Sequence, residues 1–431
     1  MIEKQKFIAT PMGNMPFDWE KYTLSELSEF ITKGATPTTY GFKWQDSGIT
    51  FLRSECVSEL GYSESGVAFI SKEAHDAMER SKIKGGDILI SITGNVGRIA
   101  VYPLDKTEGN INQHIARVRI IKKEIANREF IYYQLNQRNY RNYYLGIITG
   151  AAYPQLSLKQ IRETSVYLPP LQTQKRIADI LSAYDDLIEN NLKRIKLLEQ
   201  AAQNIYKEWF VNLRFPGYEN THINEETGLP VGWSNSELDS VTTVQSSKRV
   251  FLADYVDNGV PFYRGKEISQ KVKHEDVSEP YFISHEKFRE FDSRFGSPKE
   301  NDILITAVGT IGNCYLVRNS DVPFYFKDGN LLWIHSYNEN VSGFYLIQYF
   351  QSPIFKEILN SITIGSSQKA LTITAVKKLN ITVPNNEMLE KFDSIIKPTM
   401  KQIEVLAKTM TRLKAARDIL LPRLMNRTIE V

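Results

Sequence analysis

Apolar positions along the chain first pick out two long helical stretches. Between residues 171 and 210 they recur at steps of three and four, which is the spacing of one stripe on a helix. That stripe consists of Ile177, Leu181, Tyr184, Ile188, Leu192, Ile195, Leu198, Ala202, Ile205 and Trp209. From residue 386 onward the same phase is kept, with Thr399 and Arg417 as interruptions, by Phe392, Ile396, Ile403, Met410, Leu413, Leu420 and Leu424. Each stretch predicts an amphipathic helix of about 36 residues, which is about 54 Å long at about 1.5 Å per residue.

The rest of the chain alternates short apolar runs with turn residues. Residues 49–57 (ITFLRSECV) and 260–268 (VPFYRGKEI) are rich in β-branched and aromatic residues and predict strands. Residues 87–93 (DILISIT) and 302–308 (DILITAV) are bounded by turn residues and predict buried strands. Helices are expected over FIYYQLNQRNYRNYY from Phe130 and FYLIQYFQSPIFKEIL from Phe344. These patterns together predict a mixed α/β fold.

The sequence contains an internal duplication. KGGDILISITGNVGRIAVY from Lys84 aligns with KENDILITAVGTIGNCYLV from Lys299, 215 residues further on. The same shift brings Leu156 onto Leu371 and Pro169 onto Pro384, and Phe130 and Gln134 meet Phe344 and Gln348 at a shift of 214. Agreement at one shift over several windows is not a chance event, and the length of 431 residues is close to twice 215.

A repeat of globule and helix predicts how the chain is organised. A long amphipathic helix needs a partner to cover its apolar stripe, and the helix of the other copy is the obvious one. We therefore expect a pseudo-two-fold repeat in which globular domains at 1–170 and 213–385 are joined by helical regions at 171–212 and 386–431. The two helices are expected to pair antiparallel as a coiled coil. Pro398, which replaces Ala183 of the first copy, either kinks its helix or marks the first turn.

Composition removes several classes of protein. Lys+Arg 53 against Asp+Glu 50 leaves a net charge of +3, which does not by itself indicate a nucleic-acid binder. Two distant cysteines, Cys56 and Cys314, exclude a disulfide framework or a cysteine-rich zinc site and suit a reducing cytosol. No apolar stretch approaches the roughly 18 residues of a membrane span, and the N-terminus lacks a signal-peptide core. We expect a cytoplasmic protein.

Enzymatic motifs are absent from the sequence. It has no P-loop, no HExxH, no GxSxG, no GxGxxG after a strand, and no adenine-methyltransferase signature. We therefore predict no catalytic residue, no metal site and no cofactor on this chain. Asp87 and Asp302 precede the repeated DILI strand, and their repetition at one turn favours a structural role for both.

Features that suit binding lie in loops that the two copies do not share. Glycines in Gly94–Arg98 and Gly309–Asn313 let a backbone approach a ligand, although a tight turn explains them as well. The segments 33–39 (KGATPTT) and 246–249 (SSKR) have a phosphate-contacting composition, with a solvated loop as the alternative. Arg53 and Arg264 occupy equivalent strand ends, where a guanidinium is able to bind guanine or simply to form a surface salt bridge. Similar scaffolds with different loops are suited to reading two different short targets.

The chain resembles the specificity (S) subunit of bacterial and archaeal type I restriction–modification systems. The resemblance rests on GNMPFDW before LSELSEF, on GLPVGW at the start of the second copy, and on GDILISITGNVG repeated as NDILITAVGTIG. It continues through GAAYPQLSLKQIRETSVYLPPLQTQKRIADIL and YKEWFVNLRFPGYE. It covers nearly the whole chain and is most specific from Tyr153 to Tyr218.

The resemblance implies a non-catalytic, DNA-binding subunit. The two globular domains would be target-recognition domains that read a bipartite, asymmetric site in double-stranded DNA. Two modification (M) subunits would carry S-adenosylmethionine and methylate adenine N6, and restriction (R) subunits would use ATP and Mg²⁺. If both domains read one side of the duplex, the half-site centres lie about 10 bp apart. The second helical region lacks the QTQ start of the first, so the two M-docking faces are expected to differ.

We assign candidate residues to these two kinds of contact. The predicted DNA-binding residues are Lys33, Thr36, Thr38, Arg53, Asn95, Arg98, His114, Tyr153, Gln155, Lys248, Arg249, Arg264, Lys266, Thr310, Asn313, Gln368 and Lys369. The predicted partner-binding residues are Ile188, Leu192, Tyr206, Phe210, Ile403, Met410 and Leu421. Two alternatives stay open, a coiled-coil scaffold that does not read DNA and a self-contained enzyme with an unrecognised site. The target bases do not follow from the sequence, because base readout depends on loop geometry and DNA shape.

Overall fold

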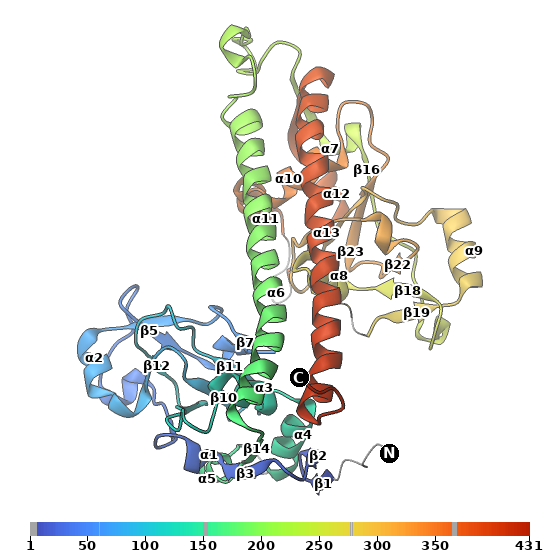
Figure 1. Ribbon diagram of the computed structural model, residues 1–431. Helices are drawn as coiled ribbons and strands as arrows, with labels where there is room; N and C mark the ends of the chain where they lie inside the picture. The colour runs from blue at the N-terminus through green and yellow to red at the C-terminus, as the bar shows by residue number, and fades with distance from the viewer. Residues whose placement is uncertain (1–6, 60, 150–153, 276, 278, 364–368) are drawn as a thin grey trace. The chain divides into compact units, whose positions relative to one another are not determined.

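The structure is a computed structural model that describes residues 7–431, apart from residues 60, 150–153, 276, 278 and 364–368 (Figure 1). The chain divides into two compact units. Unit 1 combines Met1–Ile188 with Leu413–Val431, and unit 2 is Glu189–Arg412. Each unit therefore contains one globular part and a section of both long helices.

Unit 1 is built on two four-stranded sheets. One sheet is antiparallel, in the order β11-β10-β13-β4, and the other has the order β8-β5-β12-β9 with β5 and β12 parallel. The strands are β4 (Thr32–Lys33), β5 (Ile49–Leu52), β8 (Ala68–Ile70), β9 (Lys82–Ile83), β10 (Ile88–Ser91), β11 (Ile99–Val101), β12 (Gly109–Ile111) and β13 (Ile115–Val118). Two-stranded pairs are made by β1 (Phe7–Thr10) with β2 (Gly13–Pro16), β3 (Glu20–Thr23) with β14 (Ser165–Leu168), and β6 (Val57–Ser58) with β7 (Gly61–Tyr62).

Unit 2 repeats this topology. Its antiparallel sheet has the order β16-β23-β20-β21, and its second sheet has the order β17-β19-β18-β22 with β18 and β22 parallel. The strands are β16 (Thr243–Gln245), β17 (Tyr255–Val256), β18 (Val260–Tyr263), β19 (Tyr281–Ile283), β20 (Ile303–Thr306), β21 (Cys314–Leu316), β22 (Tyr325–Phe326) and β23 (Leu331–His335). A pair β15 (Ser234–Glu237) with β24 (Asn380–Val383) corresponds to β3 with β14. The duplication in the sequence thus preserves the whole antiparallel sheet, and in the second sheet it preserves β8-β5-β12 as β19-β18-β22. Among the described strands, β9 is matched by none in unit 2 and β17 by none in unit 1.

The short helices correct two expectations. In each copy the predicted single helix is a pair, α3 (Arg128–Leu135) with α4 (Arg138–Ile147) and α10 (Gly343–Gln351) with α11 (Pro353–Ile362). The breaks occur because Gln137 and Ser352 adopt extended backbone, and Ser352 caps a helix that starts at Pro353. The second half of the predicted strand 260–268 is helical, because the Glu267 carboxylate accepts from the Arg264 backbone N–H and so caps the start of α8 (Gly265–Val272). The remaining helices are α1 (Leu24–Leu27), α2 (Lys72–Ala77), α5 (Leu158–Arg162), α7 (Leu238–Val241), α9 (His285–Phe295) and α12 (Ile373–Lys377).

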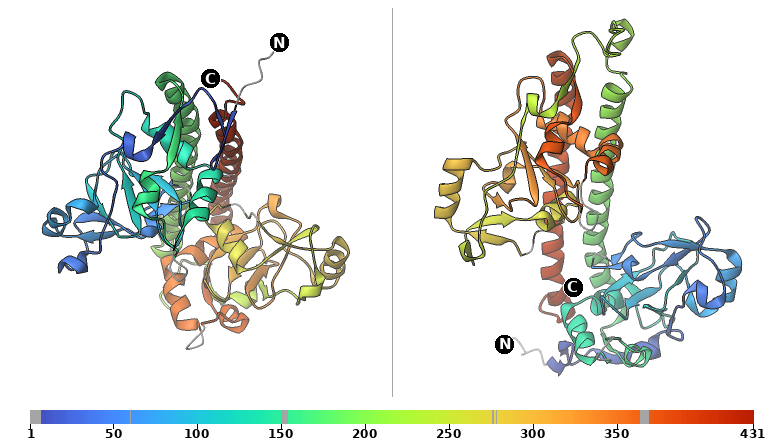
Figure 2. Two further views of the ribbon diagram at one scale, coloured as in Figure 1. Left: turned by 90° about the horizontal axis from the view of Figure 1, so that it is seen from below. Right: turned by 180° about the vertical axis from the view of Figure 1, so that it is seen from behind.

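The two long helices are α6 (Leu171–Tyr206), which ends in a π turn at Lys207–Val211, and α13 (Asn386–Met425). Within unit 2, Ile195 packs in one cluster with Ile403 and Met410, and Tyr206 contacts Phe392. Later positions of α6 therefore meet earlier positions of α13, and the helices pair antiparallel, side by side in both views (Figures 1 and 2). α13 continues through Pro398, so this proline does not mark a first turn.

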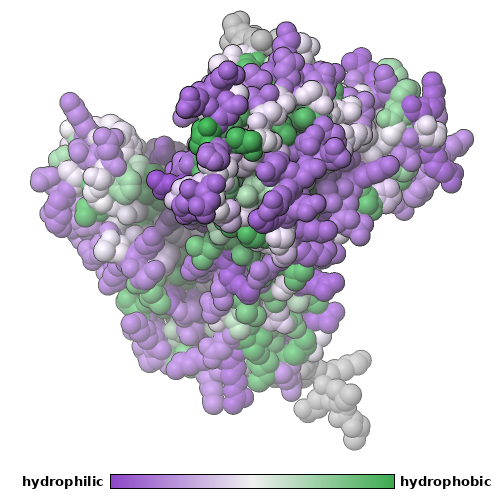
Figure 3. Space-filling view, turned by 90° about the horizontal axis from the view of Figure 1, so that it is seen from above, coloured by the Kyte–Doolittle hydropathy of each residue, from purple (hydrophilic) through white to green (hydrophobic). Residues whose placement is uncertain are grey.

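Each unit has its main core between its antiparallel sheet and the helices. In unit 1, Phe130, Tyr140 and Tyr144 of α3 and α4 are fully buried against that sheet, together with Leu181 of α6. In unit 2, Tyr345 and Phe355 take the corresponding places, together with Phe392 of α13. The face seen in Figure 3 is largely hydrophilic, with hydrophobic residues in small patches.

Candidate nucleic-acid interface

In unit 1 the carboxyl ends of the parallel strands β5 and β12 bring polar residues together. Leu52 is in register with Ile111, and the Asn112 backbone N–H donates to the Leu52 carbonyl at 3.0 Å. Arg53 directly follows β5, while Asn112, Gln113 and His114 follow β12. We call these four residues the unit 1 edge. Carboxyl ends of parallel strands are a common place for ligand sites, since the following loops diverge there.

A chain of hydrogen bonds links this edge to two other loops. The Thr36 hydroxyl donates to Gln113 Oε1 at 2.7 Å, and Gln113 Nε2 lies 3.0 Å from His114 Nε2. If the Gln113 amide donates there, His114 is the neutral tautomer that carries its proton on Nδ1, which lies 2.6 Å from the Thr93 hydroxyl. The backbone of Thr93 in turn pairs with Gln155. The predicted residues Thr36, His114 and Gln155 are therefore brought into one polar cluster.

Three more of the predicted residues of unit 1 present exposed side chains. Lys33 is the last residue of β4, Thr38 lies in the 3-10 helix Pro37–Tyr40, and Asn95 lies at a loop tip. Arg53 is also exposed, and its Nε donates to the Gly66 carbonyl at 2.7 Å. Tyr153 lies outside the described residues.

The glycine loops are tight turns, which is the alternative weighed from the sequence. In unit 1 the Ser91 hydroxyl donates to the Asn95 carbonyl and accepts from the Arg98 backbone N–H at 3.0 Å. In unit 2 the Thr306 hydroxyl does the same with Thr310 and Asn313. The paired glycines adopt positive φ, +68° and +77° in the first loop and +71° and +84° in the second. Only glycine adopts such angles easily, so these glycines are required by the turn.

The side chains that follow these turns are engaged within the chain. Arg98 Nη2 pairs with Glu59 Oε1 at 3.1 Å, and Arg141 approaches the same carboxylate at 3.4 Å. Asn313 Nδ2 donates to the Ser269 hydroxyl at 2.8 Å. Arg98 and Asn313 were predicted to contact DNA, but here they hold their own unit together. Thr310 remains exposed at the loop tip.

Asp87 and Asp302 cap turns, as their repetition predicts. Asp87 Oδ2 accepts from the Lys84 backbone N–H at 2.9 Å, and Asp302 Oδ2 accepts from Lys299 at 2.7 Å. Asp87 also binds Arg119 through both carboxylate oxygens, and Asp302 accepts from the Trp333 indole at 2.8 Å. Both aspartates are buried and serve the fold.

Unit 2 forms the equivalent edge with different side chains. The Lys327 backbone N–H donates to the Tyr263 carbonyl at 2.9 Å, the counterpart of the Asn112–Leu52 bond. Arg264 follows β18, and Lys327 and Asp328 follow β22. We call these three residues the unit 2 edge. Arg249 reaches it from its own loop, because its Nε donates to Asp328 Oδ2 at 3.1 Å.

The remaining predicted residues of unit 2 lie near this edge or on exposed loops. Lys248 is exposed and stacks its ammonium group over the Phe295 ring at 5.1 Å. Lys266 is exposed in the first turn of α8, and Lys369 is exposed before the bridge at Ala370. Gln368 lies outside the described residues.

Arg264 is held in place by two neighbours. Its Nη2 and Nε donate to the two carboxylate oxygens of Glu267 at 2.7 Å and 3.2 Å, and its guanidinium lies 4.3 Å from the Tyr281 ring centroid. The hydrogen bond with Glu267 raises the pKa of Arg264. Burial acts to raise the pKa of Glu267, but the hydrogen bonds from Arg264 outweigh it and lower that pKa. The pair is therefore fully charged at neutral pH.

Several residues at these edges escaped the sequence analysis. Gln113 and Asp328 stand at equivalent positions, 215 residues apart, after strands that are only three and two residues long. The duplication shift would have paired them if these short strands had been recognised. Glu267 left no such signal, because unit 1 has only a three-residue 3-10 turn where unit 2 has α8. Tyr281 left none either, because the matching position of β8 is Ala68.

The partner-binding assignment needs correction at five positions, because their side chains are buried. Tyr206 and Phe210 belong to the aromatic core of unit 2, and Ile403 and Met410 are buried against Ile195. Ile403 and Met410 belong to the apolar stripe of α13, whereas Tyr206 and Phe210 lie outside the stripe of the first helix. All four are buried within the chain, so they offer no surface to a partner. Ile188 is buried and Leu421 packs partly against the core of unit 1, whereas Leu192 is exposed.

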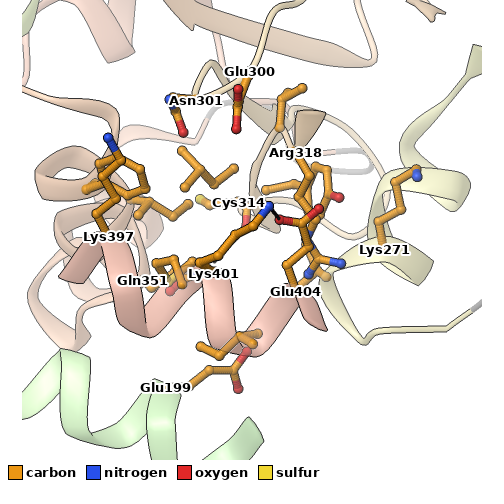
Figure 4. Close-up of a pocket in the computed structure, with 18 of the residues that line it drawn as sticks. Glu199, Lys271, Glu300, Asn301, Cys314, Arg318, Gln351, Lys397, Lys401 and Glu404 are labelled. Atoms are coloured by element: carbon orange, nitrogen blue, oxygen red, sulfur yellow. Dashed lines mark hydrogen bonds and ion pairs between the residues drawn. The ribbon is translucent and has the colours of Figure 1, made fainter. Parts of the chain in front are cut away.

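A pocket of about 540 Å³ opens in unit 2 between α8, β21 and α13 (Figure 4). Its floor contains Cys314, and its charged rim is compensated internally. Lys401 pairs with Glu404 at 2.9 Å, and Lys271 pairs with Asp321 at 2.8 Å. Two of the four cations that line the pocket, Lys271 and Lys401, therefore already have carboxylate partners, and Arg318 and Lys397 line it as well.

Two searches of the described residues gave negative results. They contain no group of three or more His, Cys, Asp or Glu side chains placed to hold a metal ion. Within the same residues, no helix combines the length and the apolar character that a bilayer crossing requires.

Similarity to known proteins extends over nearly the whole chain. The type I restriction modification DNA specificity domain matches residues 16–200 and again residues 230–415. The type I restriction enzyme MjaIX specificity subunit of Methanocaldococcus jannaschii is 26% identical over 427 residues, covering 97% of this chain and 95% of the relative. The putative MjaX specificity subunit of the same organism is 24% identical, covering 100% and 98%. The crystal structure of the S subunit of a type I restriction–modification system from M. genitalium shares the fold, with a TM-score of 0.58 at 15% identity over 96% of this chain and 99% of that one.

Proposed function

This chain belongs to the type I restriction–modification DNA specificity family and recognises DNA sequence, and we propose that its two units read the two parts of one target through the unit 1 edge and the unit 2 edge. One observation carries the proposal. The same sheet edge recurs in both units, but it presents Arg53, Gln113 and His114 in one and Arg264 and Asp328 in the other. A shared scaffold with unlike polar groups is suited to reading unlike bases.

The chemistry of the two edges implies an asymmetric target. The Gln113 amide carries the donors and the acceptor that match the Hoogsteen edge of adenine, and contact with a base would exchange its bonds to Thr36 and His114. Asp328 offers acceptors only, which matches the exocyclic amino group of cytosine or adenine. The exposed cations Lys33, Lys248 and Lys266 flank these groups and supply contacts to phosphate.

We further propose that the chain is not itself catalytic. It directs adenine-N6 modification subunits, two in number, and restriction subunits to its target in the cytoplasm. S-adenosylmethionine, ATP and Mg²⁺ would then be bound by these partners. The proposal is supported by the absence of nucleotide-binding and methyltransferase motifs from the sequence.

The modification subunits are proposed to dock on the outward faces of the long helices. In unit 2, Leu197 of α6 is 64% exposed and Val405 of α13 is 53% exposed. Leu192, predicted from the sequence, lies on the same helix as Leu197 and is also exposed. Exposed apolar side chains on a helix are candidates for a protein interface. They replace the buried residues assigned from the apolar stripe.

Methylome sequencing of cells that carry the complete system tests the proposed function. We expect methylated adenines in one motif with two different parts and an unread spacer. A single continuous palindrome would contradict two-unit reading. If the chain assembled with modification subunits but the complex bound no duplex, the scaffold alternative would be favoured instead.

A further inference from the structure

We propose that Glu267 determines base specificity in unit 2 by holding the guanidinium of Arg264 so that its end edge, the fork made by Nη1 and Nη2, faces a guanine. This inference rests on the proposed function, since it assumes that the unit 2 edge meets the floor of a DNA groove. Glu267 is a positioning residue in it, and Arg264 is the group that contacts the base.

The geometry leaves one edge of the guanidinium available. A guanidinium has a side edge, made by Nε and one terminal nitrogen, and an end edge, made by the two terminal nitrogens. Glu267 occupies the side edge with both of its oxygens, at 2.7 Å and 3.2 Å. The end edge therefore points away from the carboxylate, with one proton on Nη2 and two on Nη1.

Glu267 is well fixed itself. It is 1% exposed, and its Oε2 also accepts from the Arg264 backbone N–H at 2.8 Å. This second bond ties the carboxylate to the start of α8. The orientation of the Arg264 side chain is thereby tied to the backbone of the helix that it caps.

An aromatic pair restricts the remaining freedom. The Tyr281 ring, 43% exposed, lies under the guanidinium, and it stacks on Tyr255 with centroids 5.0 Å apart and an angle of 12°. A planar cation on a ring face resists tilting out of that plane. The Arg264 side chain as a whole still keeps 31% of its surface exposed.

The first copy offers an internal comparison. Arg53 also follows the strand that pairs in parallel, and its Nε is also tied, to the Gly66 carbonyl at 2.7 Å. No other hydrogen bond of its guanidinium occurs in the described part of the chain. In both copies Nε of this arginine is hydrogen-bonded within the chain, and the edge made by Nη1 and Nη2 is left for a ligand. Only unit 2 adds a buried carboxylate and an aromatic ring.

The free fork selects guanine on chemical grounds. Two parallel N–H donors match the O6 and N7 acceptors that guanine presents in the major groove. Adenine presents N7 beside an amino donor, and thymine presents one acceptor beside a methyl group, so neither accepts both protons. A guanidinium that rotated freely would discriminate less, and the clamp by Glu267 therefore strengthens specificity.

Substitution of 7-deazaguanine, one guanine at a time, tests the inference. The duplex carries the target found by methylome sequencing, and the full chain is used in complex with its modification subunits. Loss of N7 opposite Arg264 should weaken binding about 10- to 150-fold, as expected for one hydrogen bond to a charged group. Arg264→Ala and Arg264→Lys should abolish this penalty at one guanine only.

Glu267→Gln tests the positioning role. It preserves size but presents one acceptor instead of two, so the penalty at the same guanine should fall while penalties elsewhere persist. The unchanged penalties show that the variant is folded. Removal of any acidic charge also raises non-specific DNA affinity, and Glu286→Gln, an exposed first-turn glutamate of α9 in the same unit, measures that effect.

The possible results separate the claims. If every penalty persists in both Arg264 variants, Arg264 does not read guanine and the inference is wrong. If Glu267→Gln matches Glu286→Gln at all positions, the positioning role is wrong. If the unsubstituted complex shows no preference for its target over other duplexes, the proposed function itself fails, and this inference with it.

Discussion

Asp185 of α6 and Arg417 of α13 form an ion pair across unit 1, with 2.6 Å between Oδ1 and Nη1. The Tyr133 hydroxyl donates to the other oxygen of Asp185 at 2.7 Å, so one carboxylate joins both helices to α3. In the sequence Arg417 looks like an interruption of the apolar stripe. In the structure Arg417 is the ion-pair partner of Asp185, where α13 passes α6 within unit 1.

Arg417→Ala should therefore destabilise unit 1. Asp185 would keep Tyr133 but lose its cation in a partly buried site, which typically costs about 1–3 kcal/mol in the free energy of unfolding. Denaturant unfolding followed by circular dichroism measures the change. Arg423→Ala, an exposed position six residues further along α13, is the matched control and should change stability little. Equal effects of the two variants would contradict a specific role for the ion pair.

Gln174 explains why the first helical region starts with QTQ and the second does not. This fully buried amide accepts from the Asn127 backbone N–H at 2.8 Å and donates to the carbonyls of Ile125 and Pro169 at 2.8 Å and 2.7 Å. The equivalent residue in unit 2 is Leu389, which packs in an apolar core. At this one position the difference lies inside each unit.

Gln174→Leu should be strongly destabilising although leucine is the residue of the other copy. It would leave one buried N–H and two carbonyls without partners, a loss of about 2–4 kcal/mol. Thermal unfolding of the full chain measures it. The exposed neighbour Gln172→Leu serves as the control, and a Gln174→Leu variant as stable as that control would show that the buried groups find other partners.

In the glycine turn of unit 2, the stability cost of backbone strain can be measured separately from the cost of a steric overlap. Gly309 and Gly312 both have positive φ, but a Cβ on Gly309 meets open space whereas a Cβ on Gly312 would overlap Cδ2 of Leu359. Gly309→Ala should cost about 1 kcal/mol, from backbone strain alone. Gly312→Ala should cost more than this, because the Leu359 side chain must be displaced. Unfolding curves that show equal losses would contradict the packing part of this argument.

Both cysteines should be inert in the folded protein. Burial raises the pKa of Cys56 to about 11, and burial also raises the pKa of Cys314. Because the thiolate is the nucleophile, both thiols stay protonated and unreactive well above neutral pH. Iodoacetamide at pH 8 should alkylate neither in the native protein and both after denaturation, as read by mass spectrometry. Rapid native labelling of either cysteine would show that its core opens.

The sequence predicted features set by periodicity and repetition. The apolar stripe between residues 171 and 210 became α6 with its π turn, and the repeated DILI strands became β10 and β20. Asp87 and Asp302 cap turns as expected. These succeeded because helix spacing, strand burial and turn capping are local properties of the chain.

Features set by tertiary contacts were missed. Residues 264–268 were predicted as strand, because the cap that Glu267 forms on the Arg264 backbone N–H is a geometric relation that strand propensity does not reveal. Tyr206 and Met410 were assigned to partners, because periodicity identifies an apolar face but not which surface covers it. The role of Arg98 was missed because its partner Glu59 lies 39 residues away.

Unit 1 is built from two separate segments of the chain, and this affects the order in which the two units can fold during translation. Leu424 and Met425, 2% and 1% exposed, complete a core that otherwise comes from the first 188 residues. Unit 2 is a single continuous segment and is fully translated before those two residues leave the ribosome. Domains that emerge first usually finish folding first. Here the order of completion is reversed, and the first half of the nascent chain must wait, with part of its core open, for the last residues to arrive.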